Sequence, residues 1–150
     1  MALFARNPAA KPLRLIAEEA DDLAPLAALL QDSVLRAGDM AYDKAGRHFT
    51  LRLNRFCHES GGTVPLRAPS VLRISCVTRV QIRHLDPAKS QQVLSLLDIE
   101  TETLDAPACA LTLRFAGNAA PDVRVEAECI DVLLMDLAVP RRAKSTPQHS

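Results

Sequence analysis

The stretch from Val71 to His84, VLRISCVTRVQIRH, is longer than most β-strands and carries its arginines at odd-numbered positions only. Because successive side chains of a strand point to opposite faces, these arginines are expected to share one face, and most of the apolar side chains the other. A strand of this length is expected to bend or to carry a β-bulge, and the break of parity at Val77 and Thr78 predicts the bulge there. The run therefore favours a curved antiparallel sheet.

Patterns on both sides of this run predict further elements. Apolar residues at helical spacing predict an amphipathic helix over Asp21–Leu35. An alternating pattern around a turn that contains Gly46 predicts a β-hairpin over Met40–Phe56. Two more strands, joined by a short loop, are expected at Cys109–Phe115 and Val123–Glu128.

Two segments are ambiguous between helix and strand. Residues Gln91–Leu104 alternate like a strand but follow a suitable helix start at Asp86, so a helical turn that runs into a strand is expected. The apolar-rich block Glu128–Ala138 matches a helical stripe, and we favour a C-terminal helix there over a continued strand. The predicted fold class is α+β: a curved antiparallel sheet or partly closed barrel of about five to seven strands, with an N-terminal amphipathic helix and a C-terminal helix. Such a fold is similar to a pleckstrin-homology-like barrel.

The chain is expected to hold a single α+β domain over residues 13–139. Residues 1–12 are expected to be a flexible leader, since Pro8 and Pro12 discourage regular structure, and residues 140–150 a disordered polar tail. The N-terminus has no secretory pattern, and no apolar run has membrane-spanning length. The four cysteines lack CxxC spacing and are expected to stay reduced, so a cytoplasmic location without membrane contact is predicted.

The charge balance constrains the partners. The chain has 18 basic (Lys and Arg) and 18 acidic (Asp and Glu) residues, so its formal net charge is zero. Proteins that coat nucleic acids need a net basic surface, and those that bind single strands use aromatic side chains, which are scarce here. We therefore expect no nucleic-acid partner.

Several stretches together carry a family resemblance: LLQDSVLRAGDMAY, GRHFTLRLNRFCHE, VLSLLDIE, LRFAGN and VRVEAECIDVLLMDL. On these residues the chain resembles an uncharacterised proteobacterial family, catalogued as domain of unknown function 2948, over residues 13–137. Its most distinctive pieces are LQD at Leu30–Asp32, NRF at Asn54–Phe56 and ECID at Glu128–Asp131. Members typically have an aspartate and an aromatic residue after NRF, where this chain has Cys57 and His58. The resemblance implies no activity or cofactor, and it gives these two residues no functional role.

Arginines on strands are the candidate ligand-binding residues. An anion could be held on the sheet face by the guanidinium groups of Arg52, Arg73, Arg79 and Arg83. The alternative is a solvated face on which arginines pair with carboxylates of neighbouring strands, since opposite charges across strands stabilise a sheet. The carboxylates expected for this pairing are Glu100, Glu102, Glu126 and Glu128.

No constellation of residues predicts catalysis. Cys57 and His58 would point to opposite faces of a strand, and the histidines and cysteines lack metal-ligand spacing. Asp32 is expected late in its helix, with Arg36 one turn on as its partner. The common nucleotide-binding and hydrolase motifs are absent from the sequence. No catalytic residue, metal or cofactor is predicted.

Two functional hypotheses remain. The first is a small non-catalytic binding or assembly module that acts through a protein partner or through self-association, because a sheet edge and the apolar C-terminal block favour protein contacts. The alternative is a ligand-binding barrel or enzyme that recognises an anionic small metabolite on the arginine-bearing sheet face. The sequence favours the non-catalytic interpretation.

Overall fold

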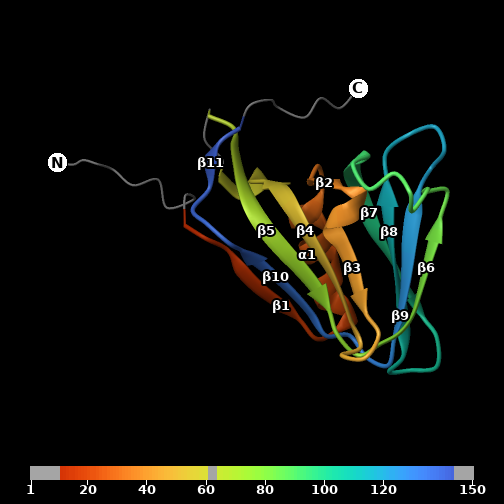
Figure 1. The fold of residues 1–150 in the computed structure, drawn as a ribbon. Helices are drawn as coiled ribbons and strands as arrows, with labels where there is room; N and C mark the ends of the chain where they lie inside the picture. Colours follow the sequence, from red (N-terminus) through yellow and green to blue (C-terminus); the bar gives the residue numbers. More distant parts are fainter. Residues whose placement is uncertain (1–10, 61–63, 144–150) are drawn as a thin grey trace.

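The computed structural model describes residues 11–60 and 64–143. Strands dominate it and form one antiparallel sheet of 11 strands (Figure 1). They are β1 (Arg14–Ala17), β2 (Val34–Arg36), β3 (Met40–Asp43), β4 (His48–Phe56), β5 (Leu66–Ile74), β6 (Val77–Arg83), β7 (Val93–Thr103), β8 (Cys109–Phe115), β9 (Asp122–Ala127), β10 (Val132–Asp136) and β11 (Arg141–Arg142). The helices of the described residues are α1 (Leu23–Leu30) and the 3-10 helices η2 (Ala20–Asp22), η3 (Ala37–Asp39) and η4 (His58–Ser60).

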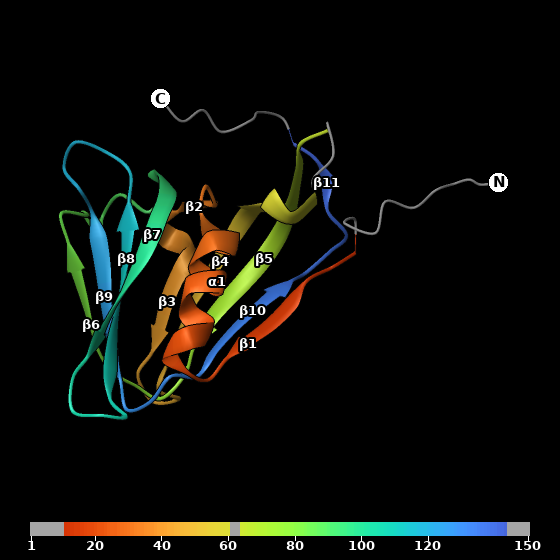
Figure 2. The same cartoon turned by 180° about the vertical axis from the view of Figure 1, so that it is seen from behind.

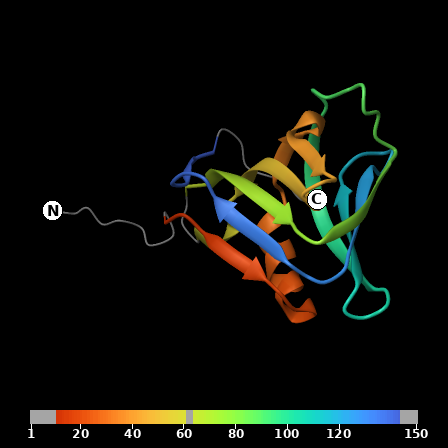
Figure 3. The same cartoon turned by 60° about the horizontal axis from the view of Figure 1, so that its bottom comes forward.

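The sheet has two parts that are joined through β7. Its strand order is β1-β10-β5-β4-β2-β7-β8-β9-β6, with β3 added to β4 and β11 added to β5. The first residues of β7 pair with β2 and the later ones with β8, with a register shift between Leu96 and Asp98. We call the strands from β1 to β2, with β3 and β11, the first sheet, and β8, β9 and β6 the second sheet. Figures 1 and 3 show both sheets and the short link from β5 to β6.

One hydrophobic core lies between the two sheets. Phe49, Leu51 and Leu72 reach it from the first sheet, and Leu113 and Val123 reach it from the second. Aliphatic side chains supply most of this core, as the low aromatic content of the sequence requires. Because both sheets bury side chains in the same cluster, the described residues form one folding unit.

The helix α1 is shorter than the sequence predicts. The carboxylate of Asp22 accepts hydrogen bonds from the backbone N–H groups of Glu18 and Glu19 just before the helix. Its apolar side is buried through Leu23, Leu26 and Leu30, and Figure 2 shows the helix in front of the first sheet. The predicted extension to Leu35 is wrong, because the chain leaves the helix after Leu30 and enters the sheet as β2.

The predicted C-terminal helix is wrong. Residues Val132–Asp136 form β10, which pairs with β1 on one side and β5 on the other. Burial alternates along β10 between buried and half-buried residues, so both of its faces carry apolar side chains. A short apolar run of this kind fits a helical stripe and a central strand equally well. The α+β class with two terminal helices and five to seven strands is therefore corrected to an open, mostly antiparallel sheet with one short α-helix within the described residues.

The long run at Val71–His84 is divided between two strands. Cys76, with a φ of 58°, lies between β5 and β6, where the chain passes from the first sheet to the second. The pairing of β6 with β9 shifts register between Val77 and Arg79, which confirms the predicted bulge. The expectation that all its arginines share one face is wrong, because β5 and β6 belong to different sheets.

The predicted leader, tail and loop can be compared with the structure only where their residues are described. Most of the predicted leader of residues 1–12 and residues 144–150 of the predicted tail lie outside the described residues. Within the span expected to be a tail, Arg141 and Arg142 form β11 and pair with β5. The segment Glu59–Ser70, which the sequence pattern assigns to a loop, contributes its last residues to the start of β5.

Candidate functional site

The second sheet carries charges that neutralise one another. Arg83 lies opposite Asp122 across β6 and β9 and donates two hydrogen bonds to its carboxylate, at 2.9 and 2.7 Å. Arg79 lies opposite Glu126, with 4.0 Å between the charged atoms. Arg114 pairs with Asp98 and Glu100 of β7, and Arg124 pairs with Glu102 of β7 and with Glu126. We call these four arginines and their carboxylates the paired face. Glu128, just after β9, pairs instead with Arg47 of the turn before β4.

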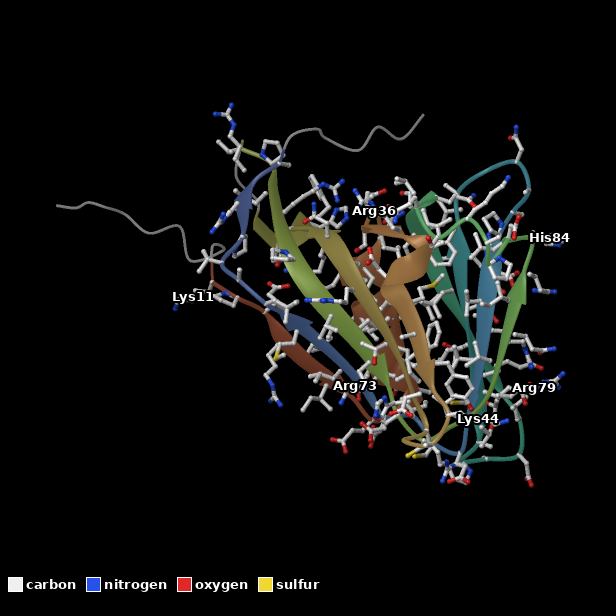
Figure 4. The ribbon with its side chains drawn as sticks, in the orientation of Figure 1. Lys11, Arg36, Lys44, Arg73, Arg79 and His84 are labelled. Carbon is white, nitrogen blue, oxygen red and sulfur yellow. The ribbon has the colours of Figure 1, made fainter. Side chains whose placement is uncertain are left out.

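The predicted ligand-binding arginines do not converge. Arg79 and Arg83 belong to the paired face, whereas Arg52 and Arg73 lie on β4 and β5 of the first sheet. Arg52 and Arg73 are exposed, and neither forms an ion pair within residues 11–60 and 64–143. Figure 4 shows Arg73 near the lower end of β5 and Arg79 at the right, beside the second sheet.

A different set of arginines meets where β11 joins β5. A cavity of about 620 Å³ is lined there by Val34, Asn54, Arg67, Pro69, Ala138, Arg141, Arg142 and Ala143. Arg67 and Arg141 are direct partners in the antiparallel pairing of β5 with β11. Among the described residues, three arginines and no carboxylate therefore line this cavity, and two of the arginines face each other across neighbouring strands.

Arg67 is held in place by backbone and aromatic contacts. One terminal nitrogen of its guanidinium donates to the carbonyl oxygens of Asp32 and Asn54, at 3.1 and 3.0 Å. The guanidinium also lies 5.4 Å from the centre of the Phe56 ring. Burial lowers the pKa of Arg67, and the negative charge of Asp32 partly opposes this effect. The side chain is thus fixed and charged, and it forms no ion pair with a carboxylate of the described residues.

A second, smaller cavity adjoins the first. Its volume is about 390 Å³, and its lining comprises Val34, Leu35, Arg36, Asp39, Arg52, Leu53, Asn54 and Val93. Val34 and Asn54 line both cavities. The carboxylate of Asp39 accepts a hydrogen bond from the backbone N–H of Arg36 at 3.2 Å. We call the two adjoining cavities together the arginine groove; Figure 4 labels Arg36 near its β2 side.

A strained aspartate lies next to Arg67, outside the lining of both cavities. Asp32 follows α1 with a φ of 70°, a left-handed conformation that is uncommon for residues other than glycine. Its carboxylate lies 3.4 Å from Nε2 of His58, and the same nitrogen is 2.8 Å from the carbonyl oxygen of Gln31. The predicted helical position of Asp32 and its predicted pairing with Arg36 are therefore wrong.

A buried ionic network is centred on Arg55, which follows Asn54 in β4. This side chain is 0% exposed and donates two hydrogen bonds to Asp136, at 3.0 and 2.9 Å, and two to Glu59, at 2.8 and 2.7 Å. Asp136 also accepts from the Ser70 hydroxyl at 2.6 Å and from the Leu13 N–H at 2.8 Å. The network joins β4, β5 and β10, so it fixes the strands that carry Asn54 and Arg67.

The ionised state of this network is favoured by its hydrogen bonds. Burial opposes ionisation of Asp136, but hydrogen bonds from Arg55, Ser70 and the Leu13 amide outweigh it and lower the pKa of Asp136. Burial likewise tends to lower the pKa of Arg55, and the hydrogen bonds and charges of Glu59 and Asp136 raise it overall. Because every charged group here has its partners, the network is structural and offers no free group to a ligand.

The other residues considered for chemistry contribute no site. Cys57 is 1% exposed, and burial raises its pKa to about 11, so it is a thiol at neutral pH. Among the described residues, no three histidine, cysteine, aspartate or glutamate side chains are grouped so that they could hold a metal ion. No helix in the described ranges has the length and apolar character needed to cross a membrane.

The comparison with known protein families matches residues 13–149 to a family described as protein of unknown function (DUF2948). The chain belongs to this family. No curated protein and no solved structure matches it. Two stretches that carry the family resemblance, LQD and NRF, lie side by side at the groove, where Asp32 and Asn54 accept hydrogen bonds from Arg67 and Phe56 contacts its guanidinium.

Sequence reasoning missed most of the groove. Arg67 lies in a segment assigned to a loop, and Arg141 and Arg142 lie in a segment assigned to a disordered tail. The only available signal was the arginine pair itself, in an otherwise polar tail. Nothing in the sequence pattern indicates that this pair lies opposite Arg67, because β5 and β11 are far apart along the chain.

Proposed function

We propose that this protein is a non-catalytic binding module that holds a phosphate or carboxylate group in the larger cavity of the arginine groove. The observation that carries the proposal is the direct opposition of Arg67 and Arg141 in a cavity that no acidic side chain of residues 11–60 and 64–143 lines. The proposal retains the expected anionic ligand and places it on arginines other than those that the sequence indicated.

The physical argument rests on uncompensated charge. Like charges directly opposite each other on neighbouring strands destabilise the pairing, and an anion between them turns this repulsion into two attractions. A guanidinium group also presents paired N–H donors that match the oxygens of phosphate and carboxylate. Because Arg67 is already oriented by two carbonyl groups, little of its side-chain freedom is left to lose on binding.

The four arginines that the sequence predicts to bind a ligand differ in their relation to this proposed site. Arg52 lines the smaller cavity of the groove. Arg73 lies outside the lining of both cavities, and Arg79 and Arg83 already have carboxylate partners. We therefore propose Arg67, Arg141 and Arg142 as the primary ligand-binding residues.

The proposal is tested by titrating the protein with inorganic phosphate in a calorimeter and by measuring its Tm at the same phosphate concentrations. Phosphate is expected to bind and to raise the Tm, and Arg141→Gln is expected to weaken binding about tenfold, as for the loss of one charged hydrogen bond. Arg73→Gln removes the same charge from an exposed, unpaired position on the first sheet and serves as the matched control. Equal weakening by both variants, or no binding at all, would contradict the proposal.

A second candidate function is self-association through β6, which ends the strand order of the sheet. Beside this edge lies a mostly apolar cavity of about 350 Å³, whose lining includes Tyr42, Val80, Ile82 and Leu85, and Ile82 is 46% exposed. An edge strand whose outer side has no strand partner within the described residues can pair with the same strand of a second copy. Light scattering over a range of concentrations is expected to show a dimer that Ile82→Lys converts to a monomer. A wild-type protein that is monomeric throughout would exclude this candidate.

A further inference from the structure

The smaller cavity of the arginine groove is lined by a second pair of arginines, and from it we infer that the ligand carries two anionic groups. The larger cavity would hold one group, and Arg36 and Arg52 of the smaller cavity would hold the other. The ligand class is an elongated small metabolite with a phosphate or carboxylate at each end. This inference rests on the proposed function, because it assigns a second anion site next to the first.

The register of β2 against β4 places the second pair. Val34 lies opposite Asn54 in this antiparallel pairing. The printed pairing ends there, and Arg36 on β2 and Arg52 on β4 each lie two residues along their own strand from this pair. Both line the smaller cavity. Each cavity of the groove is therefore lined by arginines that come from two different strands.

The charge of the smaller cavity is not balanced by its one carboxylate. Within the described part of the chain, Asp39 is the one acidic residue of the lining, and its carboxylate accepts a hydrogen bond from the backbone N–H of Arg36. Neither Arg36 nor Arg52 forms an ion pair with a described residue. With two arginines against one aspartate, this cavity keeps a formal positive charge for a second anionic group.

The two cavities adjoin and share part of their lining, so an elongated ligand that passes over this boundary can reach both pairs. Val34 and Asn54 form the shared boundary, and these side chains are uncharged. The centres of the two pairs are about two strand spacings, or about 10 Å, apart across the sheet, and about four residues, or about 13 Å, apart along the strands. The long arginine side chains shorten the gap that the ligand itself must span. An extended molecule fits this spacing, and an isolated phosphate ion occupies one site at a time.

The inference is tested with alkane bisphosphonates of increasing chain length, each compared with the monophosphonate of the same chain. When a linker spans both sites, the second contact becomes intramolecular and the affinity rises steeply. The affinity ratio of bisphosphonate to monophosphonate is expected to pass through a maximum with chain length and to exceed about tenfold there. Short bisphosphonates are expected to bind no better than monophosphonates.

Substitutions of single arginines show whether the affinity ratio of bisphosphonate to monophosphonate depends on the arginines of the groove. Arg52→Gln is expected to bring the ratio at the best chain length close to one, whereas Arg73→Gln is expected to leave it unchanged. Monophosphonate binding with a ratio near one at every length would overturn the two-anion ligand and leave the proposed function intact. Absence of all phosphonate and phosphate binding would overturn the proposed function itself. A glutamate-rich peptide that binds more tightly than every bisphosphonate would replace the metabolite by a protein segment.

Discussion

The paired face of the second sheet and the arginine groove of the first sheet use the same residue type with opposite results. On the paired face, each arginine has a carboxylate on the same or a neighbouring strand, as Arg83 has Asp122. In the groove, Arg67 instead faces Arg141. The number of arginines therefore says little about function. Strand register decides whether a guanidinium is neutralised within the chain or left for a ligand.

The buried Arg55 network is a third arrangement of arginine, and a substitution in it is expected to change the free energy of unfolding most. Asp136→Asn removes one of the two carboxylates that neutralise Arg55 and leaves its charge inside the first sheet. Loss of one partner of a buried ion pair is expected to lower the free energy of unfolding by about 3 kcal/mol. Urea denaturation measures this change. Glu59→Gln, which removes a more exposed partner of the same arginine, should have a clearly smaller effect.

The same network predicts a pH dependence. Its hydrogen bonds hold the pKa of Asp136 below its ordinary value of 3.8, so the unfolded chain takes up this proton at a higher pH than the native protein does. The stabilisation by ionised Asp136 is therefore complete above that ordinary value and is lost as the pH falls through the native pKa. The difference in unfolding free energy between the wild type and Asp136→Asn should shrink as the solution is acidified. A difference that stays constant at acid pH would contradict the assignment.

Replacing one arginine by glutamine in each region tests the comparison between the paired face and the arginine groove. Without ligand and at low salt, Arg83→Gln should lower the free energy of unfolding slightly, because Asp122 loses its partner. Arg141→Gln should raise it by a similar amount, because the repulsion of Arg67 is relieved. Both changes follow from denaturation curves of the ligand-free protein. The same sign for both variants would break the distinction between the two regions.

Salt gives the smallest expected effect. Added sodium chloride screens attraction and repulsion alike. The changes in unfolding free energy caused by Arg83→Gln and by Arg141→Gln should therefore both approach zero as the ionic strength rises. Added phosphate should instead stabilise the wild type and should stabilise Arg141→Gln less. Equal stabilisation of both proteins by phosphate would indicate a general ionic effect and no site at the groove.

The features that could be predicted from the sequence are those that depend on residues close together in the chain. The alternation of apolar and polar residues indicated antiparallel strands, and the parity break at Val77 and Thr78 indicated the bulge. The closing helix was predicted wrongly because residues Val132–Asp136 are apolar on both faces, as a strand between β1 and β5 requires. A pattern of one short segment contains no information about the strands on either side of it.

The groove could not be predicted for a related reason. Arg52 was selected because it lies on a strand with clear alternation, but the cavity that it lines is completed by residues of β2 and η3. Arg67 and Arg141 come together only through the pairing of β5 with β11. These pairings depend on the complete arrangement of the sheet, and no local spacing in the chain indicates them.

The shared strand β7 has a consequence for how this molecule unfolds. Its first residues are hydrogen-bonded to β2, which borders the groove, and its later residues are hydrogen-bonded to β8. Neither half of the molecule can therefore melt alone without breaking a strand that the other half needs. Thermal unfolding should be a single cooperative transition, and amides of β2 and β8 should exchange with deuterium at similar rates.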